Sequence, residues 1–389
     1  MLKVDLIYSG YMTSPNGASM FVKKMDGLKE KFAENGIELR VISQDLIKQR
    51  LFNDTEEIRK RVSLREKVFA LAKYSVLVTK FIIHRTDDKY SKLILDYYEN
   101  KVSDKADVVA FQEGSCCYHY LKRNWDKKQK VLLTMHNSGE IWSMWYIRLP
   151  RLKSCFFNRY RNDFEQTLFR GCDKIGFVAD LPRKKFVSLY PYEEKKTYFA
   201  YNGIEIKEMP ERKVSSTLDL ISVGSLCDRK NQIGILNAVG LLPTEYQKKI
   251  TVTLVGDGSA RMELESKAKE LSSNVLFTGS AKEVDKYLAK SNCFILFSKD
   301  EGLPISIIEG MRAGLPVIGT NIAGIPEQII EGETGFLVDV DESQLAERLK
   351  CLVDNLDKLP EMGEASYQLF VEKFTIDAMV RKYAEIYKQ

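Results

Sequence analysis

Apolar runs of strand length alternate along the first half of the chain with segments whose apolar positions recur at helical spacing. Strands that alternate with helices are typical of βαβ units, which give parallel strands and right-handed crossovers. The first half therefore predicts a doubly wound α/β domain. Its predicted strands are residues 3–8, 37–43, 107–111, 130–135, 173–178 and 197–200.

The second half repeats this pattern after a polar, irregular stretch at residues 201–217, which we interpret as a linker. We expect two Rossmann-like domains that face each other across a cleft, residues 1–200 and residues 218–365. A helical segment at 366–389 is expected to pack back onto the first domain. The predicted strands of the second half are residues 218–223, 251–255, 275–278, 293–298, 315–319 and 336–338.

Composition is ordinary for a globular protein, with 389 residues, 44% of them hydrophobic and 29% charged. Seven cysteines are scattered without a C-x-x-C pair, which favours reduced thiols and a cytoplasmic location. The first residues have the pattern of a strand and not of a secretion signal. The longest apolar stretch, 68–83, is interrupted by lysines and is too short to span a bilayer.

Charge is divided unevenly between the halves. Residues 1–200 carry a net charge of +12 and residues 201–389 a net charge of −7. A basic half indicates an anionic partner. Because no nucleic-acid-binding signature is present, we expect an anionic membrane surface or a phosphate-bearing acceptor in preference to nucleic acid.

Aromatic and basic residues are interleaved at residues 140–168. Trp142 and Trp145 recur at helical spacing, and an i+4 series from Leu152 to Leu168 follows Pro150. Trp, Tyr and Arg side chains in this arrangement fit a helix lying on a membrane interface. A core-facing helix with a solvated basic face is the favoured alternative, and both interpretations stay open.

Residues 293–320 predict a strand, a tight loop, a helix that opens at Pro304 and a second strand. The backbone N–H groups of Gly302, Leu303 and Ile305 would then converge at a helix N-terminus, which favours binding of a phosphate. Glu301 and Glu309 flank this terminus, and carboxylates accept hydrogen bonds from hydroxyls. A phosphate cradle between two hydroxyl acceptors fits a nucleoside diphosphate sugar.

Four further residues are weaker candidates. Arg229 and Lys230 lie in a predicted βα loop, where cations would neutralise a diphosphate, although such pairs are often solvated. His136 lies at the carboxyl end of a predicted strand, where open α/β sheets bind ligands, although a lone histidine is more often structural. Gly17 precedes a helix and is either a point of close ligand approach or an ordinary loop glycine.

Taken together, these motifs resemble the retaining nucleotide-sugar glycosyltransferases of family four, which have the GT-B fold. The resemblance is carried by Glu301 and Glu309 at the E-x7-E spacing within EGLPISIIEGMRAGLPVIGT, and by VGSLCDRKN, VGDGSARMELE, FTGSAKEVDKYLAKSN and AGIPEQIIEGETGFLV. PNGAS, LLTMHNSG and YNGIEI match more weakly in the first half. One position departs from the family, because Ser225 stands where an arginine is usual.

The resemblance implies a role for each candidate. Glu301 would contact the hydroxyls of the donor sugar and Glu309 those of the ribose. The amides of Gly302, Leu303 and Ile305, together with Lys230 and Gly17, would contact the diphosphate. Ser280 and Ala281 would contact the base, and His136 would contact the sugar. Arg229 is a candidate to replace the cation missing at Ser225.

The resemblance also implies an activity: retaining transfer of a hexose or N-acetylhexosamine from a nucleoside diphosphate sugar, with a UDP-sugar expected, to a glycan or lipid-linked glycan acceptor. Such an enzyme would serve surface polysaccharide or glycoconjugate synthesis and need no metal or other cofactor. We interpret Asp339-Val340-Asp341 as a solvated turn and not as a metal motif. The alternatives are a non-catalytic GT-B subunit, which Ser225 favours, and a sugar epimerase, for which we identify no acid–base set.

Overall fold

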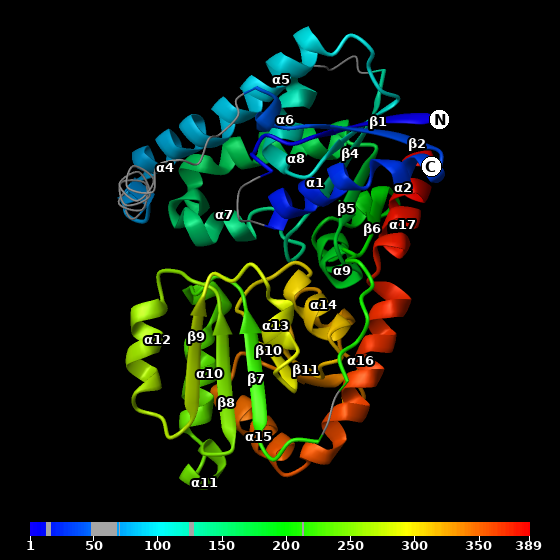
Figure 1. Cartoon of the computed structure of the whole chain (residues 1–389). Coiled ribbons are helices and arrows are strands. Elements are labelled where there is room, and N and C mark those ends of the chain that lie inside the picture. The colour runs from blue at the N-terminus through cyan, green and yellow to red at the C-terminus, as the bar shows by residue number, and fades with distance from the viewer. Residues whose placement is uncertain (13–16, 48–67, 70, 124–127, 212–213) are drawn as a thin grey trace. The chain divides into compact units, whose positions relative to one another are not determined.

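The computed structural model describes residues 1–12, 17–47, 68–69, 71–123, 128–211 and 214–389. The chain divides into two compact units. The first unit comprises Met1–Ala200 with Val380–Gln389, and the second unit comprises Tyr201–Met379. Each unit contains one six-stranded sheet with helices packed against it (Figure 1). Within the described residues, no helix combines the length and the apolar character needed to cross a bilayer.

The first unit has a wholly parallel sheet in the order β2-β1-β3-β4-β5-β6. Its central strands, β3 and β4, are apolar and almost entirely buried, as expected for parallel strands covered on both faces. The strands are β1 (Leu2–Ile7), β2 (Ile37–Ile42), β3 (Val108–Phe111), β4 (Lys130–Met135), β5 (Lys174–Phe177) and β6 (Thr197–Phe199). The α-helices are α1 (Gly17–Gly27), α2 (Lys29–Glu34), α4 (Val76–Ile82), α5 (Lys89–Lys101), α6 (Gly114–Arg123), α7 (Ser143–Arg148), α8 (Asn158–Gly171) and α9 (Asp180–Leu189).

The second unit also has a wholly parallel sheet, in the order β12-β11-β10-β7-β8-β9. Its strands are β7 (Leu218–Val223), β8 (Ile250–Val255), β9 (Asn274–Gly279), β10 (Cys293–Leu296), β11 (Val317–Thr320) and β12 (Gly335–Val338). Its helices are α10 (Gln232–Gly240), α11 (Thr244–Gln247), α12 (Arg261–Ala268), α13 (Asp285–Leu288), α14 (Ile305–Arg312), α15 (Glu342–Val353) and α16 (Leu359–Lys373). The last helix, α17 (Ile376–Lys388), belongs to the second unit as far as Met379. The two doubly wound α/β sheets predicted from the sequence are confirmed.

The C-terminal segment is shared between the units. The sequence assigned all of 366–389 to the first domain, but α16 belongs to the second unit and packs against α14. Only Val380–Gln389 joins the first unit, where Tyr383 packs against Phe21 with ring centroids 5.6 Å apart and Tyr387 packs against Phe32 at 6.3 Å. The boundary between the units therefore falls inside α17.

Residues 140–168 form shorter helices than their periodicity suggests. After α7, two 3-10 turns, Pro150–Lys153 and Cys155–Phe157, precede α8. Trp142 and Phe164 are at most 5% exposed, and their rings pack together with centroids 4.9 Å apart. The core-facing interpretation is thus confirmed for these two residues, whereas Phe156, in the second 3-10 turn, is 55% exposed.

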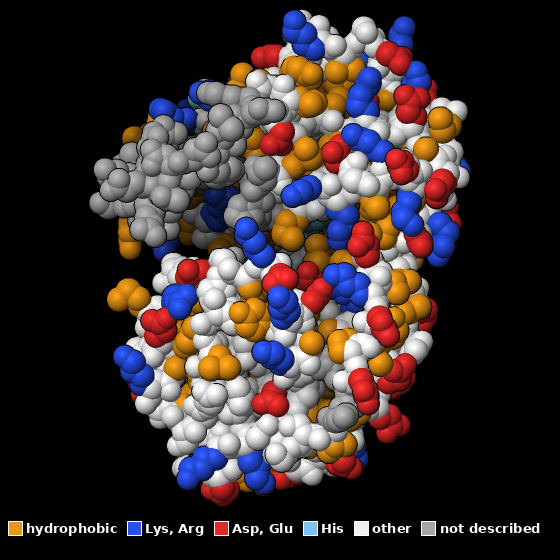
Figure 2. All heavy atoms as spheres, in the orientation of Figure 1, with side chains coloured by type: hydrophobic (Ala, Val, Ile, Leu, Met, Phe, Trp, Pro, Cys, Tyr) orange, Lys and Arg blue, Asp and Glu red, His pale blue; other side chains and the backbone are white. Residues whose placement is uncertain are grey.

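Charges of both signs are mixed on the surface that Figure 2 shows. Lysine and arginine side chains alternate with aspartate and glutamate over each unit, so neither presents a face of one sign in this view. The excess positive charge of residues 1–200 is therefore not concentrated on this face, and a basic patch has to be located residue by residue.

Candidate functional site

The strand order of the second unit reverses between β7 and β10, which are hydrogen-bonded neighbours. Because all strands are parallel, the loops after β7 and β10 leave the sheet at the same edge. In open α/β sheets, ligands bind in the crevice at such a switch point. The loop after β7 carries Arg229 and Lys230, and the loop after β10 carries Glu301. The topology thus brings the adjacent residues Arg229 and Lys230 together with Glu301, which is 72 positions after Arg229 in the sequence.

These three side chains form one ionic cluster. Oε1 of Glu301 lies 2.7 Å from Nζ of Lys230 and 2.9 Å from Nη1 of Arg229. The side chains of Glu301 and Lys230 are only 9% and 11% exposed. Arg229 also donates a hydrogen bond of 2.7 Å to the carbonyl of Asp300. The carboxylate predicted to bind sugar hydroxyls therefore pairs with both cations predicted to bind a diphosphate, and the cluster keeps one net positive charge.

The N-terminus of α14 lies in the same loop. Pro304 is the N-cap, with ψ 118°, and the helix begins at Ile305, one residue later than the sequence predicted. The carbonyl of Gly302 accepts a 2.9 Å hydrogen bond from the amide of Gly324. In the first turn, the hydroxyl of Ser306 is buried and has no hydrogen-bond partner in the described part of the chain. Ser306 is a candidate phosphate ligand that the sequence analysis missed.

Close backbone packing supports the loop after β7. Gly224 has φ +150° and Gly256 has φ +142°. A Cβ added to Gly256 would lie 1.9 Å from the carbonyl oxygen of Gly224, so only glycine fits there. Ser225, at the position where an arginine was expected, has an exposed side chain.

The other donor-binding candidates of this unit lie near the same edge. Glu309 is in the second turn of α14 and is half-buried. Ser280 and Ala281 directly follow β9, so they leave the sheet at its carboxyl edge. Asp341, by contrast, caps α15 by accepting hydrogen bonds from the amides of Ser343 and Gln344 at 2.8 and 3.0 Å. This capping role agrees with the interpretation of residues 339–341 as a turn.

His136 follows β4 in the first unit, as predicted. Its Nε2 lies 2.8 Å from Oε1 of Gln112, which follows the neighbouring strand β3. Its ring meets Phe21 of α1 edge-on, with centroids 5.1 Å apart. Burial lowers the pKa of His136 to about 4, so the imidazole is neutral at ordinary pH. A neutral imidazole held at one nitrogen leaves the other nitrogen for a ligand.

The switch point of the first unit lies between β1 and β3. There, Oε1 of Glu113 accepts a 2.6 Å hydrogen bond from the amide of Ser9, and burial raises the pKa of Glu113. Gln112 is 3% exposed, and its Nε2 has no hydrogen-bond partner among the described residues. The sequence analysis missed both residues, although they directly follow a predicted strand. Gly17 opens α1, and residues 13–16 before it lie outside the described residues.

The second unit matches a known family. Residues 205–369 match the family model described as glycosyl transferases group 1. The match includes the ionic cluster of Arg229, Lys230 and Glu301, together with the whole of α14.

Two curated relatives match part of the chain. An N-acetyl-alpha-D-glucosaminyl L-malate synthase of Bacillus anthracis is 29% identical over 209 residues, which are 53% of this chain and 54% of the relative. The Vi polysaccharide biosynthesis protein VipC/TviE of Salmonella typhi is 36% identical over 138 residues, which are 34% of this chain and 24% of the relative. The chain thus spans about half or less of the length of these relatives.

A solved structure is similar over the full length. Anabaena Alr3699/HepE in complex with UDP aligns over 100% of both chains with a TM-score of 0.68 and 15% sequence identity. At this identity the likeness shows the fold, which is GT-B, with two Rossmann-like domains. This likeness confirms the GT-B fold predicted from the motifs, and residues 205–369 match a glycosyl transferase family model.

Proposed function

We propose that this protein is a retaining glycosyltransferase that moves a hexose or N-acetylhexosamine from a nucleoside diphosphate sugar to a glycan or lipid-linked glycan acceptor. The observation that carries the proposal is the ionic cluster of Arg229, Lys230 and Glu301 at the switch point of the second unit, beside the N-terminus of α14. The family match over residues 205–369 supports the transferase class. The related fold of a protein solved with UDP supports a UDP-sugar as donor.

The cluster is suited to exchange its partners when a donor binds. A diphosphate at the N-terminus of α14 would attract Lys230 and Arg229, because its negative charge exceeds that of one carboxylate. Glu301 would then be released from its two cations and could accept hydrogen bonds from sugar hydroxyls. Donor binding and preparation of the sugar-binding carboxylate would thus be one event.

The chemistry follows from where charge develops. When the bond between the sugar and the diphosphate breaks, positive charge builds on the sugar ring and negative charge on the leaving diphosphate. Fixed cations and backbone N–H groups stabilise the leaving group without rearranging. Lys230, Arg229 and the amides of Gly302, Leu303 and Ile305 would supply this stabilisation, and the proposal needs no metal ion.

The remaining candidates complete the donor site in this proposal. Glu309 would hold the ribose hydroxyls, and the backbone at Ser280 and Ala281 would contact the base. From the first unit, neutral His136 would reach the donor sugar and Gly17 would approach the diphosphate. We further propose that the enzyme works in the cytoplasm, at the inner face of the cell membrane, in surface polysaccharide or glycoconjugate synthesis. The polysaccharide biosynthesis protein among the relatives supports that context.

A panel of nucleotide sugars tests the proposal. The purified full chain is incubated with UDP-, GDP- and ADP-sugars, and release of nucleotide is measured together with UDP affinity by calorimetry. We expect UDP to bind and one UDP-sugar to be turned over, with the sugar product keeping its anomeric configuration by NMR. Absence of both binding and turnover would contradict the proposal. Binding without turnover, restored only by a second protein, would favour the non-catalytic subunit.

A further inference from the structure

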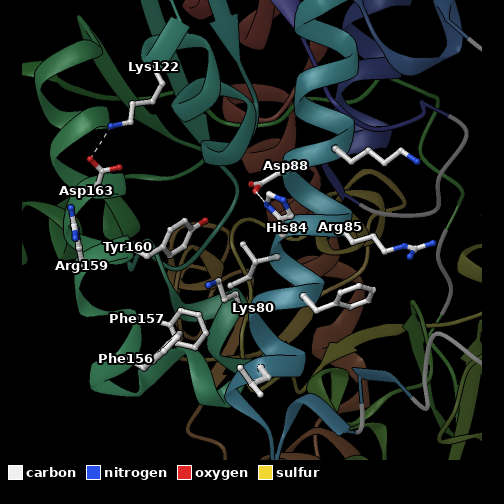
Figure 3. A pocket seen from close by; sticks show the side chains of 14 residues that line it. Lys80, His84, Arg85, Asp88, Lys122, Phe156, Phe157, Arg159, Tyr160 and Asp163 are labelled. Atoms are coloured by element: carbon white, nitrogen blue, oxygen red, sulfur yellow. Dashed lines mark hydrogen bonds and ion pairs between the residues drawn. The ribbon is translucent and has the colours of Figure 1, made fainter.

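A groove of about 1270 Å³ lies within the first unit, outside the candidate donor site. One wall is α4, continued by the π-helical turn Ile83–Asp88 and the start of α5. The other wall is the 3-10 turn Cys155–Phe157 and the first turns of α8 (Figure 3). The groove is larger than most sites for small ligands, which occupy about 300–1,000 Å³.

The mouth of this groove exposes large apolar side chains. Leu77 and Phe81, one turn apart on α4, are 74% and 53% exposed, and Phe156 on the facing wall is 55% exposed. Tyr74, three residues before Leu77, is 79% exposed. Single exposed apolar residues are normal, but several that line one concave surface mark a binding surface.

Cations surround these apolar side chains. Lys80, Arg85, Lys89 and Arg159 line the groove, and none of them forms an ion pair with another described residue. Nζ of Lys80 lies 6.0 Å from the ring centroid of Phe156, and Cζ of Arg85 lies 5.5 Å from that of Phe81. Two of the cations therefore lie over the aromatic rings of the apolar side chains.

The carboxylates of the groove are already engaged. Asp88 accepts hydrogen bonds from His84 Nδ1 at 2.7 Å and from His119 Nε2 at 2.9 Å. Asp163 pairs with Lys122 at 2.9 Å (Figure 3). Arg159 also interacts electrostatically with Asp163. Because five cations and two carboxylates line the groove, it keeps a net positive charge beside its apolar side chains.

We propose that this groove seats a phosphate-bearing lipid at the surface of an anionic bilayer. Lys80, which points toward the facing wall, would contact the phosphate, and Arg85, Lys89 and Arg159 would add positive charge around it (Figure 3). Leu77, Phe81 and Phe156 would take up the first part of the acyl chain. An anionic lipid matches both features, because it carries a negative headgroup directly above a hydrocarbon chain. A nucleic acid would satisfy the cations but would leave Leu77 and Phe81 in contact with polar groups.

The proposal deepens the proposed function only by naming the surface at which a lipid-linked acceptor would be met. Vesicle binding needs no donor sugar and no turnover, so its failure is distinguishable from failure of the proposed transferase. A chain that binds lipid but turns over no nucleotide sugar would leave the groove assignment standing and remove the transferase. A chain that turns over a nucleotide sugar but binds no lipid would support the transferase and remove the groove assignment.

Co-sedimentation tests the groove with the full chain and vesicles of phosphatidylcholine, with or without one third phosphatidylglycerol. We expect binding to the anionic vesicles to be at least tenfold tighter than to the neutral ones and to weaken as salt rises. The charge variant Lys80→Glu/Arg85→Glu and the apolar variant Phe81→Ser/Phe156→Ser should each lose at least tenfold. Lys101→Glu and Leu189→Ser, on exposed positions of the same unit outside the groove, are the matched controls and should bind as the unchanged chain does.

Circular dichroism and thermal melting confirm that each variant is folded before its binding is compared. Equal binding to neutral vesicles, or variants that bind as the unchanged chain does, would overturn the proposal. Loss in the charge variant alone, or complete release by millimolar inorganic phosphate, would reduce the groove to an anion site and also overturn it. Tighter binding of a single-stranded oligonucleotide than of vesicles, lost in the same variants, would assign the groove to nucleic acid instead.

Discussion

The ammonium group of Lys230 lies 2.7 Å from Oε1 of Glu301, and both side chains are largely buried. One residue follows β7 and the other follows β10, so their contact is made by the strand order and not by local sequence. A buried ion pair at a binding site is a switchable arrangement, because a ligand of higher charge can displace either partner.

This arrangement predicts opposite effects for the two partners on nucleotide binding. Lys230→Ala removes a cation from the proposed diphosphate site and should weaken UDP binding about 10–100-fold, the size of one charge-assisted hydrogen bond of roughly 1.5–3 kcal/mol. Glu301→Gln removes the competing carboxylate, so UDP affinity should stay equal or rise, while sugar transfer falls at least about 100-fold. Calorimetry with UDP and a transfer assay measure the two effects.

A surface lysine of the same unit serves as the control for this pair. Lys267 forms a surface ion pair with Glu270, three residues later, at 2.8 Å. Lys267→Ala should change neither UDP affinity nor the rate of sugar transfer. Weaker UDP binding in Glu301→Gln, of the same size as in Lys230→Ala, would show that the cluster acts as one structural unit and not as an exchange of partners.

The lowered pKa of His136 predicts a specific loss of stability in acid. Its pKa in the folded chain is about 4, whereas an exposed histidine titrates near 6.5. Between these values the unfolded chain binds a proton that the folded chain does not, so the free energy of unfolding falls by about 1.4 kcal/mol per pH unit as pH decreases. Above pH 6.5 this histidine contributes no pH dependence.

Urea unfolding of the unchanged chain and of His136→Gln from pH 7 to pH 4 measures this contribution. The difference in the free energy of unfolding between the two chains separates the contribution of His136 from those of the other titrating groups. We expect this difference to become smaller or to change sign as the pH falls. Parallel curves across the whole range would show that the imidazole is protonated as easily in the folded chain as in the unfolded one.

The contact between Gln112 and His136 predicts one tautomer. Because Oε1 of Gln112 is the acceptor at 2.8 Å, Nε2 of His136 carries the proton and Nδ1 is left as an acceptor for a sugar hydroxyl. Histidine ring ¹⁵N spectra should show the Nε2–H form. In Gln112→Leu the ¹⁵N signals should shift toward a mixture of the two histidine tautomers. The rate of sugar transfer should fall about tenfold, with little change in UDP affinity. The Nδ1–H form in the unchanged chain would contradict this assignment.

The close packing of Gly256 on Gly224 predicts a backbone effect on the donor site. Alanine at position 256 would place a Cβ 1.9 Å from the carbonyl oxygen of Gly224 at a φ of +142°. We expect Gly256→Ala to lower the free energy of unfolding by at least about 2 kcal/mol and to weaken UDP binding, since the displaced loop leads to Lys230. Gly27→Ala, where nothing lies within 4 Å of the added methyl group, is the control and should be neutral. Normal stability and affinity in Gly256→Ala would show that the two loops adjust independently.

Most of the fold could be predicted from the sequence, because buried parallel strands appear as continuous apolar runs and glycine marks where helices end. Gly314, with φ +66°, ends its helix as the pattern indicated. Interruptions inside periodic segments were harder to predict. Helical spacing continues over residues 20–35, yet the helix is divided at Leu28, directly after Gly27, where ψ is 15° and outside the helical range.

The site was predicted in part. The E-x7-E spacing located Glu301 and Glu309, and a strand end located His136. The pairing of Glu301 with Lys230 and Arg229 could not be predicted, because it depends on which strands are neighbours at the switch point. Gln112 was missed for a similar reason: glutamine has no distinctive chemistry until a neighbouring strand places a histidine 2.8 Å away.

Completion of the first unit depends on residues that the ribosome adds after all of the second unit. Tyr383 and Tyr387 are buried against Phe21 and Phe32, so the sheet that is synthesised first keeps an open apolar surface until residues 380–389 emerge. During translation, the second unit has the opportunity to fold before the first is finished. Nascent chains that stall before residue 380 would be the species most exposed to chaperones and proteases.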